Sequence, residues 1–386
     1  MSAYLQMGHD SVNLITEGIE DFGGVILSPV NCAPHELAHQ VSKISSVGKL
    51  DIVFDPQLYY PSSERGSLPN YSYFPSDFET ADRHSESFWK KVIEDVCITA
   101  EECGANAICS PIYIPKKYDP KYIDQCNRNF EMLRGRSTRS RPILTVCLPF
   151  NEFDDVNDSF RLSSKLTQAA PTEIYVILTS EVKPRRELND RGSLLGLMAF
   201  IRSLENAGCN TIISHSSSEL ILLKAAGASH CASGKYFNLR RFTSGRFKES
   251  GESGGKNITY WFEQGLMAFL RQADIIRIMR DGIEGVLRQG ESDNDIGRKF
   301  MAEVGATPGE KLLGLSWRQY LSWFGRMEAE LSKDDRASRA KRVLAKAQTN
   351  WQKLDQKRVR MDESENNGSW IADWQSALDE FIALEY

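Results

Sequence analysis

LDIVFDPQ, at residues 50–57, is a short apolar run that ends in a small polar cluster. The same form recurs along the first 235 residues, in AYLQMGHD (3–10), GGVILSPVN (23–31), NAICSPIY (106–113), PILTVCLPFNE (142–152), EIYVILTSE (173–181), NTIISHSSSE (210–219) and SHCASGK (229–235). The runs pass into segments whose apolar residues recur at helical spacing. Eight such units predict an α/β fold, a (β/α)8 barrel of the TIM type, with chemistry at the carboxyl ends of its strands. The alternative is an open, doubly wound sheet, but no GxGxxG follows the first run.

The chain is too long for one barrel alone. It has 386 residues, whereas the fold typically takes about 250. We expect residues 1–245 to form the barrel domain, residues 246–258 to form a Gly/Ser-rich linker, and residues 259–386 to form an all-helical C-terminal domain. Six of the seven tryptophans lie in the last segment, where we expect them to build a core between helices.

The composition excludes several classes of protein. With 41% hydrophobic residues, 26% charged residues and a formal net charge of −5, the chain is typical of a folded soluble protein and is not a wholly basic nucleic-acid binder. No apolar stretch reaches the roughly 18–20 residues that cross a bilayer, and the N-terminus lacks the features of a signal peptide. We therefore expect a cytoplasmic protein with no membrane partner. The eight cysteines form no CxxC pair, which predicts buried free thiols.

Asp55 directly follows the third run and precedes a long segment, residues 56–85, that is rich in Pro, Ser, Tyr and Asp. A loop of that length in a compact domain is usually functional, so we expect a lid or substrate loop. A carboxylate at the base of such a loop can act as a general base, a nucleophile or a metal ligand. The alternative is an aspartate held by backbone N–H groups before Pro56.

Other polar residues stand at the ends of neighbouring strands and converge on the same rim. Asn31, Glu152 and Glu181 follow the second, fifth and sixth runs. Only one strand separates strands one and seven in a closed barrel, so His9, Asp10 and His215 can share a proton relay or a metal ion; the alternative is that the histidines are bonded only by backbone. The catalytic candidates are Asp55, His215, Glu181 and His9.

Two polar clusters follow the seventh and eighth runs, where barrels usually bind phosphate. Residues 214–218 read SHSSS and precede a helix, whose free N–H groups favour an anion. Residues 233–235 read SGK and precede Arg240, Arg241 and Arg246, whose guanidinium groups suit phosphate oxygens. The alternative is a helix cap and a basic surface loop. The candidates for phosphate binding are Ser216, Ser217, Ser233, Gly234, Lys235, Arg240 and Arg241.

HELAH, at residues 35–39, matches HExxH and resembles the signature of the zinc metalloproteases. The resemblance covers five residues and implies zinc held by His35 and His39, with Glu36 activating a bound water. Pro34 places the motif in the first turn of a helix. The alternative is therefore that the helix packs outside the barrel and that both histidines face solvent.

A basic run occupies residues 336–360, with nine Lys or Arg against one acid, and an acidic segment follows it. Such a stripe can neutralise the phosphates of a nucleic acid, and then binds less tightly as salt rises. The alternative is a solvated helix that pairs with the acidic tail. The candidates for nucleic-acid binding are Arg339, Lys341, Arg342 and Lys346.

Taken together, these patterns predict a barrel enzyme, a transferase or hydrolase, that acts on a phosphate-bearing small molecule or a nucleic acid. Asp55 is its acid/base or nucleophile. The alternatives are a non-catalytic barrel that serves as a scaffold or nucleic-acid-binding subunit, and an HExxH zinc metalloprotease. The C-terminal helices are a candidate surface for a protein partner, and the sequence identifies no cofactor.

Overall fold

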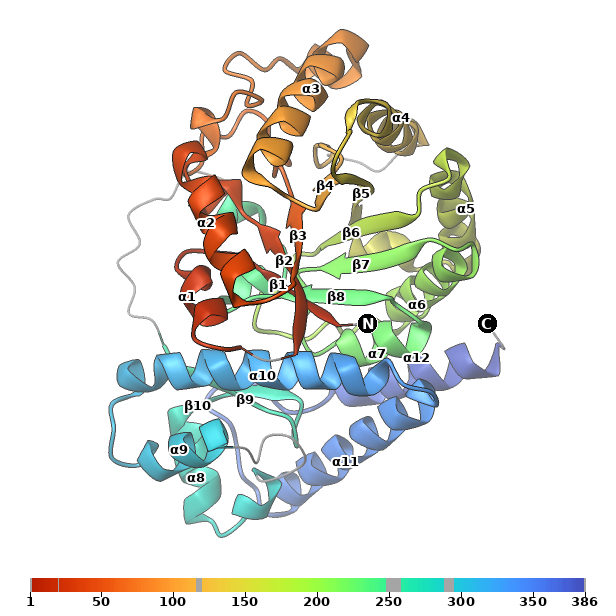
Figure 1. Cartoon of the computed structure of the whole chain (residues 1–386). Helices are drawn as coiled ribbons and strands as arrows, with labels where there is room; N and C mark the ends of the chain where they lie inside the picture. Colours follow the sequence, from red (N-terminus) through yellow and green to blue (C-terminus); the bar gives the residue numbers. More distant parts are fainter. Residues whose placement is uncertain (1, 20, 116–119, 248–257, 288–294, 385–386) are drawn as a thin grey trace.

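Eight parallel strands pair in chain order and close into a barrel, because β1 pairs with β8 as well as with β2. The computed structural model describes residues 2–19, 21–115, 120–247, 258–287 and 295–384. Figure 1 shows the strands inside a ring of helices. The predicted TIM-type barrel is confirmed, and the open sheet is excluded. The strands are β1 Ala3–Gln6, β2 Phe22–Leu27, β3 Asp51–Phe54, β4 Ala107–Cys109, β5 Arg141–Pro149, β6 Glu173–Thr179, β7 Asn210–Ser214 and β8 His230–Ser233.

Seven helices connect the strands and cover the outside of the barrel. Three of them begin at side-chain caps of the expected type, in which Ser85, Asp155 and Asp190 accept hydrogen bonds from backbone N–H groups of the first turn. The helices are α1 Ser11–Thr16, α2 Pro34–Val47, α3 Glu86–Cys103, α4 Pro120–Arg136, α5 Val156–Leu166, α6 Arg191–Asn206 and α7 Leu220–Ala226.

The C-terminal part is not all-helical, which corrects the prediction. Residues 260–271 form an antiparallel hairpin, β9 Tyr260–Glu263 and β10 Ala268–Arg271, in which Phe269 pairs with Phe262. Aromatic residues on both sides of Gly265 favour strands, but a short apolar run does not distinguish a strand from a buried helix. The helices are α8 Gln272–Arg280, α9 Asp295–Glu303, α10 Leu313–Leu331, α11 Arg336–Gln356 and α12 Trp370–Ala383.

Helix α10 takes the position of the eighth barrel helix. It packs against α7, β8 and β1, and Arg318 forms an ion pair with Glu17 at the end of α1. Figure 1 shows α10 beside β8, with α1 and α7 on either side. Residues 234–312, with the hairpin, therefore form the connection between the eighth strand and its helix. The division of the chain at residue 245 stays a prediction.

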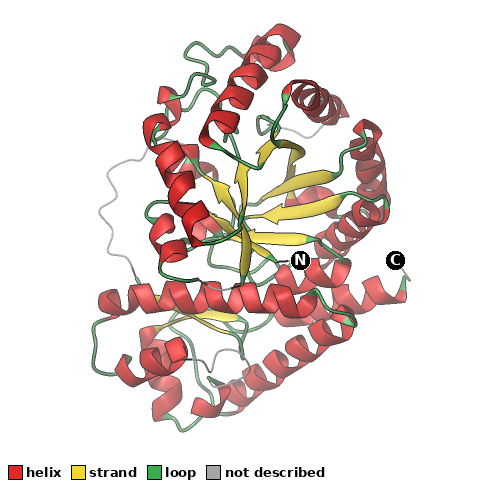
Figure 2. Ribbon diagram, viewed as in Figure 1, coloured by secondary structure: helices red, strands yellow, loops and turns green. Residues whose placement is uncertain are grey.

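The contacts between α10 and the barrel are buried and polar as well as apolar. The Tyr320 hydroxyl lies 2.8 Å from Ser233 Oγ. Lys224 Nζ of α7 lies 3.1 Å from Glu328 Oε1, and both side chains are 0% exposed. Figure 2 shows helix α10 between the barrel and the two-stranded hairpin. The predicted linker, residues 246–258, begins with two buried residues, Arg246 and Phe247, and its residues 248–257 lie outside the described ranges.

The cysteines are all buried free thiols, as predicted. No helix within the described residues has the length and apolar character that a transmembrane span requires.

Candidate active site

Asp55 lies at the carboxyl end of β3, inside the mouth of the barrel, and is 1% exposed. The Tyr59 hydroxyl lies 2.7 Å from both of its carboxylate oxygens, and the Gln57 backbone N–H donates to Oδ1 at 3.0 Å. Burial raises the pKa of Asp55 to about 6, although these hydrogen bonds, the charge of Arg246 and a bond from the Tyr175 hydroxyl act to lower it. Asp55 is therefore a carboxylate near neutral pH that accepts a proton more readily than an ordinary aspartate.

Arg246 brings a buried positive charge to this cluster. It comes from the short 3-10 helix η7, Ser244–Arg246, and is 7% exposed. Its Nη2 donates to Ser28 Oγ at 2.8 Å and to Met7 O at 3.3 Å. Burial lowers the pKa of Arg246 to about 10, so the guanidinium stays charged at neutral pH. No ion pair joins it to Asp55 among the described residues, so its charge is not neutralised by direct contact.

His215 follows β7 and lies against Arg246. Nη1 of the arginine is 3.4 Å from His215 Nε2. Since a guanidinium only donates, Nε2 accepts and Nδ1 carries the proton, which it shares with Ser214 Oγ at 3.0 Å. Burial and the charge of Arg246 hold the pKa of His215 well below its usual range, so the imidazole is neutral. The predicted catalytic residues Asp55 and His215 are thus joined to one cluster through Arg246.

Two amide groups of this cluster have no partner within the described residues. Nε2 of Gln6 and Nε2 of Gln57 are buried donors, while the other ends of both side chains are engaged. Gln6 Oε1 accepts from the Tyr175 hydroxyl, and Gln57 Oε1 accepts from Ser28 Oγ. A buried donor without an acceptor costs about 1–3 kcal/mol. Neither glutamine lines the pocket at the barrel mouth, so both amides are unsatisfied donors of the barrel interior.

The backbone is strained at two residues of the cluster. Gln57 has φ 56° and His215 has φ 51°, in the left-handed region that few residues other than glycine adopt. Strain of this kind persists where the surrounding structure fixes it and is concentrated at functional sites.

Aromatic rings close the cluster from above. Phe242 and Phe247 stack with centroids 5.4 Å apart, and both lie edge-to-face with Tyr59, at 5.5 and 5.3 Å. Phe242 also contacts His215, at 5.3 Å. The segment after β8 therefore packs over Tyr59, the residue that bonds Asp55.

A pocket of about 270 Å³ lies outside this cover and reaches Arg246. His9 and Asn31 line it together with Arg65 and Asn238, whereas Glu152 and Glu181, the other residues predicted at the rim, do not. Arg246 thus lines the pocket and also donates hydrogen bonds to Ser28 and His215. A small anion in the pocket would meet this guanidinium.

The remaining catalytic candidates stay at the rim. The side chain of His9 is 74% exposed and lies 2.8 Å from Asp10, so the predicted relay does not join it directly to His215. Glu181 is exposed, and its charge acts on Tyr60 rather than on Asp55. Glu152 is exposed as well.

The predicted phosphate-binding residues are used in contacts within the protein. Ser216 Oγ donates to Ile213 O, and Ser233 Oγ lies between Ser216 O and Tyr320. The Lys235 ammonium lies over the rings of Tyr236 and Trp317. Arg240 stacks on Tyr320 at 3.6 Å and donates to two carbonyl groups, one of them from Gly234.

Acidic side chains already occupy the start of α7, where the phosphate was expected. Glu219 Oε1 accepts from the Ser217 N–H at 3.1 Å, and Arg241 pairs with Glu219 Oε2 at 3.4 Å. Ser218 Oγ donates to Glu187. Burial and the nearby Glu219 raise the pKa of Glu187 to about 8. Phosphate binding by Ser216, Ser217, Ser233, Gly234, Lys235, Arg240 and Arg241 stays a prediction.

Glu187→Gln is expected to stabilise the protein at alkaline pH. The folded chain holds a proton on Glu187 that the unfolded chain releases. The stability that this proton gives the unmodified protein is complete below the ordinary carboxyl pKa and is lost as pH rises through about 8. At pH 9 the variant should gain on the order of 1–3 kcal/mol of unfolding free energy. Urea unfolding at pH 5, 7 and 9 measures this gain. The exposed variant Glu181→Gln is the control, and parallel pH profiles for Glu187→Gln and the unmodified protein would contradict the assignment.

HELAH lies in the first turn of α2, on the outside of the barrel, and both of its histidines are exposed. Within the described ranges, no three His, Cys, Asp or Glu side chains gather closely enough to hold a metal ion. The metalloprotease alternative therefore lacks a third ligand near His35 and His39.

The basic run forms α11, and half of its candidate residues are paired with acids. Arg339 lies 3.2 Å from Glu330, and Lys341 lies 2.7 Å from Asp379 of α12. Arg342 and Lys346 are exposed. The ion pair of Lys341 fits the alternative to nucleic-acid binding, in which the basic helix pairs with the acidic tail.

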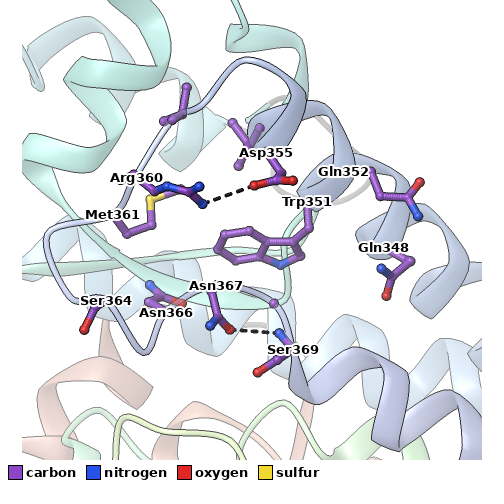
Figure 3. A pocket seen from close by; sticks show the side chains of 13 residues that line it. Gln348, Trp351, Gln352, Asp355, Arg360, Met361, Ser364, Asn366, Asn367 and Ser369 are labelled. Atoms are coloured by element: carbon purple, nitrogen blue, oxygen red, sulfur yellow. Dashed lines mark hydrogen bonds and ion pairs between the residues drawn. The ribbon is translucent and has the colours of Figure 1, made fainter.

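A wider hollow of about 700 Å³ lies between the end of α11 and residues 359–369 (Figure 3). Trp351 forms its floor, and its indole N–H donates to Leu266 O at 2.8 Å. The carboxylate that lines it, Asp355, is paired with Arg360 at 3.1 Å. The hollow therefore lacks a group poised for acid–base chemistry.

Sequence reasoning named Arg246 in the basic cluster after the eighth strand but did not place it beside Asp55 and His215, and it missed Tyr59, Tyr175, Gln6 and Gln57. Gln6 carries a signal, since an amide within an apolar strand needs a polar partner.

No family model matches the sequence, and no curated protein matches it. Among solved structures, the CutC protein of Streptococcus agalactiae is similar with 12% identity and a TM-score of 0.38, over 63% of this chain and 100% of that one. Dihydrodipicolinate synthase of Oceanobacillus iheyensis is similar with 8% identity and a TM-score of 0.34, over 99% and 96%. The carboxyl transferase domain of Rhizobium etli pyruvate carboxylase is similar with 9% identity and a TM-score of 0.38, over 97% of this chain and 56% of that one. Barrels of unrelated chemistry share such likeness, so it assigns no activity.

Proposed function

We propose that the chain is a barrel enzyme that uses Asp55 for acid–base catalysis in a transfer or hydrolysis reaction on a small phosphate-bearing molecule. The observation that carries the proposal is the buried Asp55 carboxylate at the end of β3, bonded to Tyr59 and close to the unneutralised charge of Arg246. Active sites of such barrels lie at this end of the strands.

Each group of the cluster has a defined part in this chemistry. Asp55 accepts the proton of the attacking hydroxyl or water as the new bond forms, and it returns that proton to the leaving oxygen as the old bond breaks. Burial raises the pKa of Tyr59 and of Tyr175 well above the usual range, so both phenols stay protonated and can donate. The free amides of Gln6 and Gln57 supply donors for developing negative charge.

The anionic group of the substrate is positioned by Arg246. Its guanidinium is the buried cation between the mouth pocket and the cluster, and a planar fork of donors suits a phosphate. The pocket volume of about 270 Å³ suits a small molecule. Two further lining residues, Arg65 and Asn238, stand at the pocket wall.

Asp55→Asn is expected to lower turnover about 10²- to 10⁴-fold, since it removes the proton acceptor but keeps the shape of the side chain. Phosphate release from a panel of phosphate esters and nucleotides measures it. The value of kcat/KM should rise with pH through about 6, where Asp55 ionises. Asp51→Asn is the matched control, because Asp51 stands at the opposite end of β3 and bonds Tyr4 and Arg141.

Full turnover by Asp55→Asn would refute the role of this carboxylate. A different result would favour the non-catalytic alternative: no turnover of any ester, with a salt-sensitive affinity for nucleic acid that Arg342→Glu and Lys346→Glu abolish.

A further inference from the structure

A second pocket, of about 330 Å³, lies between the β6–α6 connection and the C-terminal part of the chain. One wall carries Lys183, Arg185 and Arg186, and the opposite wall carries Ser369 and Trp370 at the start of α12. None of its lining residues lines the mouth pocket or bonds Asp55. It is therefore separate from the proposed active site.

Two buried donors in the pocket wall have no acceptor among the described residues. They are Nε of Arg186 and the indole Nε1 of Trp370, a residue that is 6% exposed. One donor belongs to the barrel and the other to the C-terminal part. Buried N–H groups are nearly always bonded, so two orphans in one wall indicate a missing acceptor.

The charge around the pocket is positive. Arg185, Arg186 and Arg271 share the single carboxylate of Glu363, at 3.2, 2.7 and 2.8 Å. Glu365 lies 2.9 Å from Arg186. Lys183 has no ion-pair partner within the described residues. Three cationic side chains therefore line the pocket, and Arg271 lies beside them, against the two carboxylates of Glu363 and Glu365. Glu187 also lines the pocket, but it holds its proton at neutral pH because burial and Glu219 raise its pKa to about 8.

The first turn of α12 adds to this field. Its residue Ser369 makes no side-chain cap; the Ser369 N–H donates to Asn367 Oδ1 at 3.0 Å, and the N–H groups of Ile371 and Ala372 donate to backbone carbonyls. The positive end of the helix dipole lies at Ser369 and Trp370, which line the pocket.

We propose that this pocket binds a phosphorylated small molecule, whose phosphate accepts from Arg186 and Trp370 and is held by the charge of Lys183 and Arg185. The donors stand on opposite walls. A phosphate presents oxygens in several directions and can accept from both walls, whereas a carboxylate presents two oxygens in one plane. The bound phosphate would join the barrel to the C-terminal part of the chain.

Isothermal titration of the full chain with inorganic phosphate and pyrophosphate tests this proposal. Arg186→Gln should weaken binding about 10- to 100-fold, and Trp370→Phe, which keeps the ring and loses the N–H, about 3- to 10-fold. Arg271→Gln is the matched control, since it removes the same charge from the Glu363 cluster without lining the pocket, and it should change binding less than about threefold.

The variants also separate this pocket from the proposed active site. Asp55→Asn and Arg246→Gln should keep the phosphate affinity that Arg186→Gln removes. Binding that survives both Arg186→Gln and Trp370→Phe would overturn the proposal, as would the absence of binding at millimolar phosphate. A loss that follows Arg246→Gln alone would place the phosphate at the barrel mouth instead. Unchanged thermal unfolding of Trp370→Phe would show that its loss of affinity does not come from misfolding.

Discussion

A chain shortened to residues 1–247 is expected to lose the cooperative unfolding transition of the full protein. The shortened chain keeps all eight strands but lacks α10, the helix that covers β8 and β1. All seven residues of α7 are buried in the full chain, because α10, α11 and α12 pack around it. An ordinary barrel helix keeps a polar face toward solvent. The truncation would expose to water the apolar side chains of α7 that face α10, α11 and α12.

Thermal unfolding followed by circular dichroism, with gel filtration, checks this result. A second chain that ends at residue 357 keeps α10 and α11 and removes α12 with the segment that leads to it, so it should retain a transition at lower temperature. A soluble, monomeric fragment 1–247 with a sharp transition would mean instead that the barrel closes without its eighth helix, and would support a domain boundary at residue 245.

Glu328→Ala is expected to lower the free energy of unfolding by about 3–5 kcal/mol. The change leaves the fully buried Lys224 amine without its carboxylate partner, bonded only to Ala228 O at 2.7 Å and Ser229 O at 3.0 Å. Glu328 Oε1 supplies the countercharge, and no other carboxylate is paired with Lys224 within the described ranges. Removing one partner of a buried pair costs more than removing both.

Urea unfolding of single and double variants measures the coupling. Replacing both residues by methionine should recover most of the loss, because it removes the buried charge together with its partner. Glu330 lies on the same helix as Glu328, and Glu330→Ala breaks its part-exposed pairs with Lys333 and Arg339. This variant should cost at most about 1 kcal/mol. Equal losses for Glu328→Ala and Glu330→Ala would contradict this account.

The strands of the barrel were predictable because each is a short apolar run followed by a break in the pattern. The bounds of β3 and β4 agree with the sequence at both ends, since Asp55 and Ser110 follow directly. The hairpin was not predictable in the same way. Its aromatic residues are buried on both faces, so no alternation of polar and apolar residues marks them as strands.

The candidate site was predictable only in part. Asp55 and His215 stand at strand ends, and the fold alone brings such positions to one rim. Arg246 reaches the site because residues 234–247 fold back over the mouth, with Phe242 bridged to Thr179 of β6. That contact depends on packing between distant segments. The serine and arginine clusters were found, but their partners, Tyr320 and Glu219, lie on elements that local spacing does not place.

The position of α10 also has a consequence for synthesis of the chain on the ribosome. The last strand of the barrel, β8, ends at Ser233, but α10, the helix that completes its β/α unit, ends only at Leu331. At about 5–20 residues per second, this helix is made roughly 5 to 20 s after the strand. During that interval the nascent chain carries eight strands and seven helices with one side of the barrel uncovered. The order of the sequence therefore delays the covering of the β8–β1 seam until α10 has been made, and leaves that seam open to chaperones until then.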